Sequence, residues 1–540
     1  MAPPPQATSI PIGASPTIPD RADVIPSIDA SSGVVIAEIP VTPVATIPEI
    51  MARARAAQNA WSARSIESRC AALRKFRDAI YAHREAVTSA ISAETGKPHV
   101  EAVFAELLLA LDSTDFIARR SPTWLKPERV PHHNIAVKAK TAWLQYEPQG
   151  VIAVISPWNY PFSIPVTEIV PALAAGNTVV LKPSELTPQC GALIGKIALA
   201  SGLPTDVLQI AQGGGELGAS IIEAGPDKVC FTGSVATGKR IAEACARELI
   251  PSVLELGGKD AMLVLADADL DVASSAAVWG GFTNCGQACL SVERLYVAAS
   301  VAGPFTQLCV EKTSRLRLGP PSDPDAEVGP MIRVRQVEKV EEQLRDAMAK
   351  GARVLAGGHR RPELGPGFFE PTVVANVDHS MQLMREETFG PVLAIASVRS
   401  TDEAIALAND SEFGLSASVW TRDSESGKAV AARLRAGSVM VNDVASYYGV
   451  CEAPHGGSGA SGWGRAHSRL GLLEMVRVKY VDVDRLPRTP KSWWYGYSGN
   501  LAASADRFVD FLFAPRWRNR LAALGGPRGA LGTILRKHRI

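Results

Sequence analysis

The sequence predicts an α/β fold with more than one hydrophobic core, and three observations lead to that prediction. The chain has 540 residues, more than a single core usually supports. Short apolar runs that end in turn-forming residues recur from Gly150 onward, and each is followed by a plausible helix. Hydrophobic residues make up 46% and charged residues 21% of the chain, as in ordinary globular enzymes. Strands that alternate with helices form parallel sheets, which bind ligands at the carboxyl ends of their strands.

Helices are predicted in the N-terminal part, after a proline-rich start. Residues 1–47 are rich in proline and are predicted to be a flexible lead-in. The first residues have neither a basic segment nor an apolar core, so no signal peptide is expected. Apolar residues then recur at three- and four-residue steps, which predicts helices in 52–61, 66–76 and 100–117, with a break at Thr95-Gly-Lys-Pro98.

Apolar runs predict the strands of two sheets. The first series consists of residues 151–155, 178–181, 207–210 and 228–231. The second series runs from Ala261 to about Val441 and includes residues 261–265, 353–355, 392–395 and 438–441. Residues 141–147 and 476–483 alternate apolar and polar side chains, which is typical of strands with one exposed face, and the second stretch is predicted to lie at a sheet edge.

Charge and cysteine content narrow the function classes. The formal net charge is +1, so charge gives no argument for nucleic-acid binding. The eight cysteines show no paired spacing of the disulfide or zinc type, so no metal site is predicted and a reducing compartment is favoured. No stretch is long and apolar enough to cross a bilayer. We therefore expect a cytoplasmic protein.

The C-terminal extension, residues 487–540, differs in composition from the rest of the chain. It carries ten Lys and Arg against two Asp, a net charge of +8, whereas the remaining chain carries −7. Phe508, Phe511 and Leu512 fall on one face of a predicted helix, and three arginines follow closely. This pattern suits peripheral contact with an anionic membrane or a lid over a long apolar substrate. Packing across an oligomer partner is the favoured alternative.

Cys289 is the candidate nucleophile. It follows a turn-prone Asn-Cys-Gly-Gln run and precedes an apolar stretch at 295–297, which places it on a loop between packed elements. On such a loop the sulfur can face a cleft, where it attacks only as the thiolate. A cysteine alone is more often a small buried hydrophobe than a nucleophile, so the motifs elsewhere in the chain decide its role.

Seven motifs occur in one order along residues 48–483. They are Ser156-Pro-Trp-Asn-Tyr-Pro-Phe162, Lys182-Pro-Ser-Glu185, Phe231-Thr-Gly-Ser-Val-Ala-Thr-Gly238, Leu254-Glu-Leu-Gly-Gly-Lys259, Gly286-Gln-Ala-Cys289, Glu386-Glu-Thr-Phe-Gly-Pro391 and Ser461-Gly-Trp-Gly-Arg465. Over this range the chain resembles the aldehyde dehydrogenase superfamily, and it is most similar to its bacterial succinate-semialdehyde and broad-range members. Seven motifs in register exceed what chance produces.

The resemblance implies a Rossmann-type nucleotide-binding domain, an α/β catalytic domain and a small β element for oligomerisation. The implied ranges are 48–127 with 148–258 for NAD(P) binding, 259–473 for catalysis, 128–147 with 474–486 for oligomerisation, and the extension 487–540. A homodimer or homotetramer is implied with them.

The resemblance also assigns the chemistry to three residues. A Cys289 thiolate attacks the aldehyde carbon, and the backbone N–H of Cys289 and the amide of Asn159 hold the oxyanion, at about 3 kcal/mol per donor. Hydride transfer leaves a thioester, for which Glu255 activates water as general base; it is also a candidate to deprotonate the thiol. Without the other motifs, Asn159 is interpreted as a turn residue and Glu255 as an ion-paired carboxylate.

The implied cofactor is NAD, with NADP as the alternative. Lys182 and Glu185 resemble the pair that holds the adenosine ribose, where a carboxylate repels a 2′-phosphate. Gly233 and Ser234 lie where a helix N-terminus meets the pyrophosphate. The other implied contacts are Ser156, Pro157, Trp158, Gly214 and Leu256, together with Glu387 and Phe389 at the nicotinamide ribose and ring.

Three features leave alternatives open. The string Gly-x-Gly-x-x-Gly occurs at 213–218 and 457–462, but only the first follows a predicted strand, and the resemblance places the pyrophosphate at Gly233 instead. His455 stands where many relatives have phenylalanine, and a plain loop histidine is favoured over a role near the nucleotide or substrate. Cys285 lies four residues before Cys289; a regulatory disulfide is a hypothesis, and packing is favoured.

The predicted function is NAD(P)+-dependent oxidation of an aldehyde to a carboxylic acid. Overall similarity points to succinate semialdehyde as substrate. The hydrophobic extension, and the lack of an evident arginine pair for a second carboxylate, favour medium- or long-chain aldehydes instead. A CoA-acylating enzyme is less favoured because Glu255 is retained. A non-catalytic scaffold is less favoured because the three catalytic candidates are all present.

Overall fold

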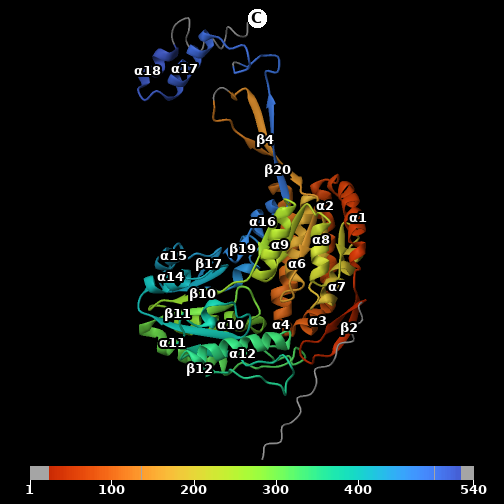
Figure 1. Cartoon of the computed structure of the whole chain (residues 1–540), viewed down its shortest axis with the longest axis vertical. Helices are drawn as coiled ribbons and strands as arrows, with labels where there is room; N and C mark the ends of the chain where they lie inside the picture. Colours follow the sequence, from red (N-terminus) through yellow and green to blue (C-terminus); the bar gives the residue numbers. More distant parts are fainter. Residues whose placement is uncertain (1–22, 135–136, 492, 525–540) are drawn as a thin grey trace, which may run out of the picture. The chain divides into compact units, whose positions relative to one another are not determined.

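The computed structural model describes residues 23–134, 137–491 and 493–524, which form two compact units (Figure 1). The main unit comprises the described residues up to Leu125 together with residues 147–477. The second unit comprises residues 126–146 and the described residues from Val478 onward. Two large sheets lie in the main unit, and a small sheet followed by two helices lies in the second.

The chain begins with an ordered hairpin. Strand β1 (Val24–Ile28) pairs antiparallel with β2 (Val35–Pro40), and Ser27, fully buried, donates a 2.7 Å hydrogen bond to Glu94. The prediction of a flexible lead-in was therefore wrong from residue 24, because the β-branched residues of the two strands outweigh the prolines among them. Residues 1–22 of that predicted lead-in lie outside the described part of the chain.

Helices follow where the periodicity predicted them. They are α1 (Ile47–Ser62), α2 (Ile66–Ala82), α3 (Arg84–Thr95), α4 (His99–Glu101), a π-helical turn η2 (Ala102–Leu107) and α5 (Leu108–Trp124), with a short 3₁₀ turn η1 (Val44–Thr46) before them. Ser65 caps α2 by accepting from the N–H of Ser68. Gly96 ends α3 with φ 77°, where a Cβ would lie only 2.5 Å from Pro330. The predicted break at residues 95–98 is confirmed.

The first large sheet has six strands in the order β19-β9-β8-β5-β6-β7. Its strands are β5 (Val151–Ile155), β6 (Thr178–Lys182), β7 (Leu208–Ile210), β8 (Lys228–Thr232), β9 (Ser252–Glu255) and β19 (Gly462–Trp463). Its helices are α6 (Ser163–Ala175), α7 (Pro188–Ala200), α8 (Gly215–Glu223) and α9 (Val235–Arg247). All neighbouring strands are parallel except β19, which pairs antiparallel with β9. The four predicted strands are confirmed, and every residue of β5 and β6 is buried.

The second large sheet has seven strands in the order β12-β13-β14-β11-β10-β16-β17. They are β10 (Asp260–Val264), β11 (Val292–Ala298), β12 (Arg353–Ala356), β13 (Thr372–Ala375), β14 (Val392–Val398), β16 (Ser416–Trp420) and β17 (Ser438–Val441). Only β12 runs antiparallel. The predicted strands did not include β11, β13 and β16, although residues 295–297 of β11 form an apolar stretch. Strand β16 is buried but begins Ser-Ala-Ser, so it shows no apolar run.

Further helices surround this second sheet. They are α10 (Leu270–Phe282), α11 (Ala299–Thr313), α12 (Val334–Ala349), α13 (Gln382–Arg385), α14 (Thr401–Asn409) and α15 (Ser424–Ala431), with 3₁₀ turns η4 (Thr283–Gly286) and η5 (Ser446–Gly449). Helix α16 (Ser468–Glu474) packs instead on α5 and α6. A two-stranded piece, β15 (Phe413–Gly414) with β18 (Ser458–Gly459), completes the main unit. Because β10 follows β9 after four residues, the two sheets are joined by the Leu256-Gly-Gly-Lys259 turn.

The second unit contains a three-stranded sheet in the order β20-β4-β3 and two helices. The strands are β3 (Glu128–Val130), β4 (Lys140–Pro148) and β20 (Val476–Asp484), and the helices are α17 (Gly499–Phe513) and α18 (Trp517–Leu524). Both predicted strands are confirmed, and β20 lies at a sheet edge as predicted. Among the described residues, no helix is both long and apolar enough to span a bilayer.

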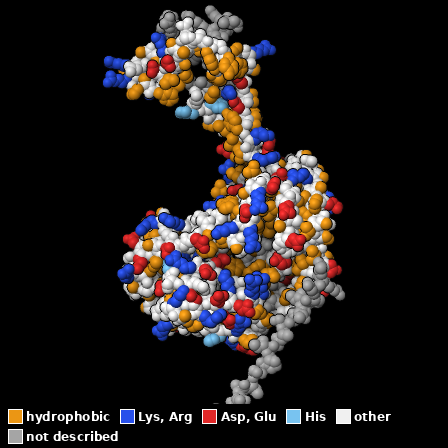
Figure 2. Space-filling model, viewed as in Figure 1, with side chains coloured by type: hydrophobic (Ala, Val, Ile, Leu, Met, Phe, Trp, Pro, Cys, Tyr) orange, Lys and Arg blue, Asp and Glu red, His pale blue; other side chains and the backbone are white. Residues whose placement is uncertain are grey.

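Large apolar side chains are exposed on the helical part of the second unit, where orange surface gathers around α17 and α18 (Figure 2). Phe508, Phe511 and Leu512 are only half-buried there. Val509, Phe513, Trp517 and Leu521 each expose more than half of their surface. The exposed apolar residues are therefore partly different from the face that the sequence predicted.

Candidate active site

The loop that carries Cys289 is held in an unusual backbone conformation. Asn284, Cys285 and Gly286 have φ values of 52°, 55° and 69°, all in the left-handed region. The side chain of Glu101 stabilises this loop by accepting hydrogen bonds from the N–H of Asn284, at 3.0 and 3.1 Å, and from the Thr283 hydroxyl. Non-glycine residues in this region cost free energy and gather at functional sites.

Two glycines allow three loops to meet at Cys289. A Cβ on Gly258, in the turn after β9, would lie 2.2 Å from the carbonyl oxygen of Cys289. A Cβ on Gly286 would lie 2.2 Å from the carbonyl oxygen of Gly390. Side chains at either position would therefore force apart the loops at 255–259, 284–289 and 386–391.

Cys289 is the one cysteine of the eight that is not fully buried. Together with Met440 and Tyr448, it packs against a buried cluster of Leu290, Leu415 and Tyr447. Burial raises the pKa of the Cys289 thiol well above its ordinary value, and the carboxylates of Asp260, Glu387 and Glu255 raise it further. The thiol is therefore protonated at neutral pH, so catalysis needs a proton acceptor.

Asn159 is fixed between this loop and the loop after β5. Its side-chain N–H donates a 3.0 Å hydrogen bond to the carbonyl of Gln287, and its own carbonyl accepts from the Asn284 amide at 3.0 Å. An asparagine amide has two N–H donors, and Gln287 takes one of them. The second N–H remains available for an oxyanion.

A buried ion pair, which sequence reasoning missed, holds the Asn159 loop. Lys97 lies 2.7 Å from Glu106, both side chains are fully buried, and Lys97 also donates to the carbonyl of Asn159. The other carboxylate oxygen of Glu106 accepts from the N–H groups of Phe162 and Ser163, at the start of α6. Glu106 lies in the π-helical turn η2, a distortion that is frequent at functional sites. The Thr95-Gly-Lys-Pro98 break was the available signal.

Glu255 ends strand β9 and is 4% exposed. Burial raises its pKa well above the ordinary value; Glu168 and Glu474 raise it further and Arg465 opposes them. No described residue donates a hydrogen bond to either carboxylate oxygen. The imidazole of His455 lies close by, with its Nε2 3.5 Å from Oε2 of Glu255. The sequence favours a plain loop histidine at position 455. The structure differs, because His455 is buried beside Glu255.

Four predicted cofactor residues follow neighbouring parallel strands. Ser156 follows β5, Glu185 follows β6, Gly214 follows β7 and Gly233 follows β8. Since the carboxyl ends of parallel strands lie at one edge of a sheet, these residues share that edge. A Cβ on Gly214 would have no neighbouring atom within 4 Å, so sterics do not require glycine there.

Three features make this edge suitable for binding a dinucleotide. Ser234 caps the 13-residue helix α9, and the first turn of α9 has no acidic residue, so its N-terminus can bind a pyrophosphate. Lys182 lies 3.3 Å from Glu185, whose side chain is half exposed and can accept hydrogen bonds from ribose hydroxyls. The buried hydroxyl of Ser156 has no partner among the described residues.

The predicted nicotinamide side is organised by a second buried ion pair. Glu293 of β11 pairs with Lys259 and accepts from the N–H groups of Thr388 and Phe389 at 2.8 and 3.0 Å. Glu387 accepts from the N–H of Gly258 at 3.0 Å, and burial raises its pKa to about 7.

Aromatic and backbone contacts complete this side. Phe389 has φ 57°, and its ring meets that of Trp158 edge to face, with the ring centroids 5.4 Å apart. Pro157 lies between Trp158 and Ser156 in the same loop. Leu256 packs against Gly238 and donates its N–H to the carbonyl of Ser461.

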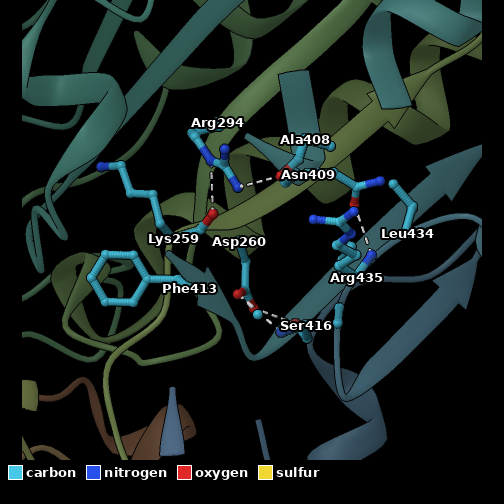
Figure 3. A pocket seen from close by; sticks show the side chains of 13 residues that line it. Lys259, Asp260, Arg294, Ala408, Asn409, Phe413, Ser416, Leu434 and Arg435 are labelled. Atoms are coloured by element: carbon cyan, nitrogen blue, oxygen red, sulfur yellow. Dashed lines mark hydrogen bonds between the residues drawn. The ribbon is translucent and has the colours of Figure 1, made fainter. Parts of the chain in front are cut away.

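Polar side chains of β10 and β11, together with residues between Ala408 and Ala436, line a small hollow (Figure 3). The guanidinium of Arg294 donates to the carbonyl oxygens of Lys259 and Ala408, while Asp260 accepts from the N–H and hydroxyl of Ser416. These contacts fix the starts of β10 and β11, which frame Cys289. Burial raises the pKa of Asp260 to about 8.

Cys285 has a packing position. It is 2% exposed and belongs to the hydrophobic core of the seven-stranded sheet. Both Cys285 and Cys289 are free. Among the described residues, no cluster of His, Cys, Asp and Glu is arranged to hold a metal ion.

Comparison with known proteins identifies relatives over most of the chain. The family model described as "Aldehyde dehydrogenase family" matches residues 18–481. A protein of Mycolicibacterium smegmatis, provisionally named succinate-semialdehyde dehydrogenase [NADP(+)], is 41% identical over 453 residues, 83% of this chain and 87% of its own. The 4,4'-diapolycopene aldehyde oxidase of a Methylomonas species is 38% identical over 492 residues, 91% of each chain. The crystal structure of betaine aldehyde dehydrogenase from Staphylococcus aureus in complex with NAD+ gives a TM-score of 0.82 at 32% identity, over 87% of this chain and 93% of that one.

Proposed function

The chain belongs to the aldehyde dehydrogenase family, and we propose that Cys289, Asn159 and Glu255 are the residues with which it oxidises apolar aldehydes. The enzyme converts an aldehyde to a carboxylic acid with NAD(P)+ as acceptor. Which residues act, which aldehyde is preferred and what the extension does are parts of the proposal.

The first step uses the sulfur and two donors. Cys289 Sγ gives its proton to a base, for which Glu255 is the candidate, and bonds to the aldehyde carbon, so that the carbonyl π electrons move to oxygen. The free N–H of the Asn159 amide and the backbone N–H of Cys289 bind the oxyanion. The fixed position of Asn159 between two loops supports this role, because a preorganised donor needs no rearrangement as the charge develops.

The second step returns the enzyme to its starting state. The bound nicotinamide supplies the hydride acceptor, and its ring and ribose would be held by Trp158, Phe389 and Glu387. Loss of hydride from the adduct, as the oxyanion re-forms the carbonyl, leaves the acyl group bound to Cys289 as a thioester. Glu255 accepts a proton from water as the water oxygen attacks that thioester, and the acid leaves as sulfur regains its electron pair. Retention of a buried carboxyl here supports water over CoA as the acyl acceptor.

The surroundings of Cys289 carry the substrate assignment. Cys289 packs against the apolar cluster of Leu290, Leu415 and Tyr447, which Met440 and Tyr448 also contact, and the strongest charge effects on its thiol come from carboxyl groups. When these carboxyl groups are ionised, they make the electrostatic potential at the sulfur negative. When they are protonated, they contribute no net charge. A second carboxylate on the substrate would lose its hydration there without gaining a cationic partner. An apolar chain fits these surroundings better.

The relatives favour two different substrates. The match to the diapolycopene aldehyde oxidase covers 91% of this chain, so it must extend past residue 481, where the family model ends, and into the extension. The match to the mycobacterial relative covers 83% of this chain and need not do so. Succinate semialdehyde is the second candidate, because the mycobacterial relative at 41% identity is named for it.

A substrate series tests the assignment. With NAD+ and then NADP+, kcat/KM is measured for butanal, hexanal, decanal and succinate semialdehyde. For apolar aldehydes we expect kcat/KM to rise by about fourfold per added CH₂ until the site is filled, from about 0.8 kcal/mol per buried group. Succinate semialdehyde is expected to fall below butanal, which has the same carbon number. The reverse order would replace the apolar assignment with the semialdehyde one.

The cofactor preference is proposed to be NAD. Glu185 is half exposed beside Lys182, where its carboxylate can bind both hydroxyls of a ribose but would repel a 2′-phosphate. The series with NADP+ provides the comparison, since the mycobacterial relative is named for NADP+.

A homo-oligomer through β20 is also part of the proposal. Within the described residues β20 pairs on one side only, and Val478, Tyr480 and Val483 each expose close to half of their surface or more. A strand edge with such side chains can pair with a second copy.

The extension is proposed to attach a cytoplasmic enzyme to anionic membrane surfaces. Trp517 is 66% exposed on α18, the guanidinium of Arg518 lies 5.7 Å from its ring, and the extension carries a net charge of +8. Exposed aromatic side chains can bury apolar surface in a membrane interface, and nearby arginines are attracted to anionic lipids. Peripheral membrane binding depends on these two contributions. A lid over the substrate and a contact with an oligomer partner are the other assignments for this segment.

Flotation with vesicles tests the attachment. We expect full-length enzyme to float with phosphatidylserine vesicles at low salt and to remain below phosphatidylcholine vesicles. Changing Arg516, Arg518 and Arg520 to Gln should release the enzyme from the vesicles, because each arginine contributes about 1 kcal/mol to the free energy of membrane binding. A control that changes Arg119, Arg247 and Arg399, which are exposed in the main unit, should still float. If the unaltered enzyme never floats, or if the control is released equally, the assignment is wrong.

A further inference from the structure

The mechanism leaves unexplained why the proposed base faces a histidine. Glu255 and His455 are 200 positions apart in the sequence, yet their side chains are 4% and 5% exposed and 3.5 Å apart, between Oε2 and Nε2. Hydrogen bonds in ligand-free active sites are often long and shorten in the reacting complex. The geometry therefore brings one donor to a carboxyl group that accepts no hydrogen bond from any other described residue.

The position of the His455 ring is fixed from its other side. Nδ1 lies 2.9 Å from the hydroxyl of Tyr447, and the same hydroxyl is hydrogen-bonded by Ser438. The backbone of His455 is held by reciprocal hydrogen bonds with Ala466, at 2.9 and 2.8 Å. If Ser438 donates to Tyr447 and Tyr447 donates to Nδ1, the ring proton must be on Nε2, facing Glu255.

The charge state agrees with that tautomer. Burial lowers the pKa of His455 to about 3, with His467 and Arg465 lowering it further, so the ring is neutral at physiological pH. The groups that face Glu255 are His455 and Arg465, which favour its ionised form, and Glu168, Glu474 and Cys289, which do not. His455 thus offers an N–H donor without a positive charge.

We propose that His455 is a positioning residue: its Nε2–H binds the Glu255 carboxylate and holds it ready to accept the proton of the water that hydrolyses the thioester. Tyr447 selects the tautomer that makes this possible. The inference rests on the role of Glu255 in the proposed function. Because the donor stabilises the ionised carboxyl, it lowers the pKa of Glu255 and extends activity to lower pH.

Two substitutions at one position separate this role from packing. His455→Gln can keep a donor near the place of Nε2, whereas His455→Asn keeps a group facing Tyr447 but is too short to reach Glu255. His467→Asn is the matched control, since His467 is also buried in the same aromatic cluster, 6.0 Å from the His455 ring, and asparagine tolerates its φ of 57°. Tyr447→Phe keeps every carbon and removes only the hydroxyl.

The readouts are the pH profile of kcat and the burst of NADH in the first turnover, with thermal denaturation as a check on folding. For His455→Asn we expect the acid limb of kcat to move up by about one pH unit, with kcat about tenfold lower at neutral pH. The burst should become more prominent because hydrolysis, not hydride transfer, is slowed. His455→Gln should recover most of the loss, Tyr447→Phe should shift the limb less in the same direction, and His467→Asn should leave it unmoved.

The opposite outcomes are equally clear. An unmoved acid limb in His455→Asn, equal shifts in the Asn and Gln variants, or an equal shift in His467→Asn would each overturn the inference. If His455→Asn does not fold, an unmoved limb in Tyr447→Phe overturns it. A Glu255→Gln enzyme with normal turnover would instead remove the proposed base itself, so the two failures are distinguishable.

Discussion

Replacing Cys289 by alanine is expected to abolish aldehyde oxidation, with kcat reduced by at least about 10⁴-fold, because without the sulfur no tetrahedral adduct forms from which hydride can leave. Dinucleotide binding should be largely unchanged, since the residues proposed for the adenosine ribose and the pyrophosphate follow strands β6 and β8 of the other sheet. NADH formation and NAD+ affinity, measured on the same preparation, separate the two effects.

Cys285→Ala is the matched control for that experiment. Cys285 lies on the same loop but is buried in the core, so its loss should lower stability by about 1 kcal/mol and leave kcat within a few fold of the unaltered enzyme. Thermal denaturation and steady-state kinetics check the two expectations. Equal activity of the Cys289→Ala enzyme would refute the covalent mechanism, and inactivity of both variants would point to loop distortion instead.

The fold was predictable wherever one stretch of sequence determines one element. The run Val151–Ile155 is apolar throughout because β5 is covered on both faces, and it became a strand with those bounds. The helices at 47–62 and 66–82 followed from their apolar periodicity. Strand β16 was not predictable in this way, because its burial comes from neighbours β10 and β17 and not from its own composition.

The candidate site was predictable as a set of residues but not as a set of contacts. Motif order indicated Cys289, Glu255 and Asn159, each within a short recognisable string. The groups that position them come from distant parts of the chain: Lys97 reaches the carbonyl of Asn159 across 62 positions, and His455 reaches Glu255 across 200. A sequence pattern records local periodicity and turn chemistry, and neither specifies which buried charges meet after folding.

Replacing Glu255 by glutamine is expected to stop the enzyme after one turnover. Glutamine keeps the size of the side chain but cannot accept a proton from water, so thioester hydrolysis should slow by about 10²- to 10⁴-fold. If Glu255 acts only in hydrolysis, rapid mixing should still give a burst of close to one NADH per active site, followed by a slow steady phase. Because the pKa of Cys289 is raised, some group must accept its thiol proton. If the burst slows as much as the steady phase, Glu255 is that group as well as the base for hydrolysis.

The pH dependence of the unaltered enzyme gives an independent check of the same residue. A general base works only when it is ionised, so kcat should fall as pH drops through the pKa of Glu255. Burial, together with Glu168 and Glu474, raises that pKa well above the ordinary 4.5, and Arg465 only partly opposes this. The acid limb should therefore lie well above pH 4.5 and should disappear in Glu255→Gln, whose residual rate cannot depend on this ionisation. A limb that persists unchanged in that variant would assign the titration to another group, and Glu387, with its pKa raised to about 7, would be the first to examine.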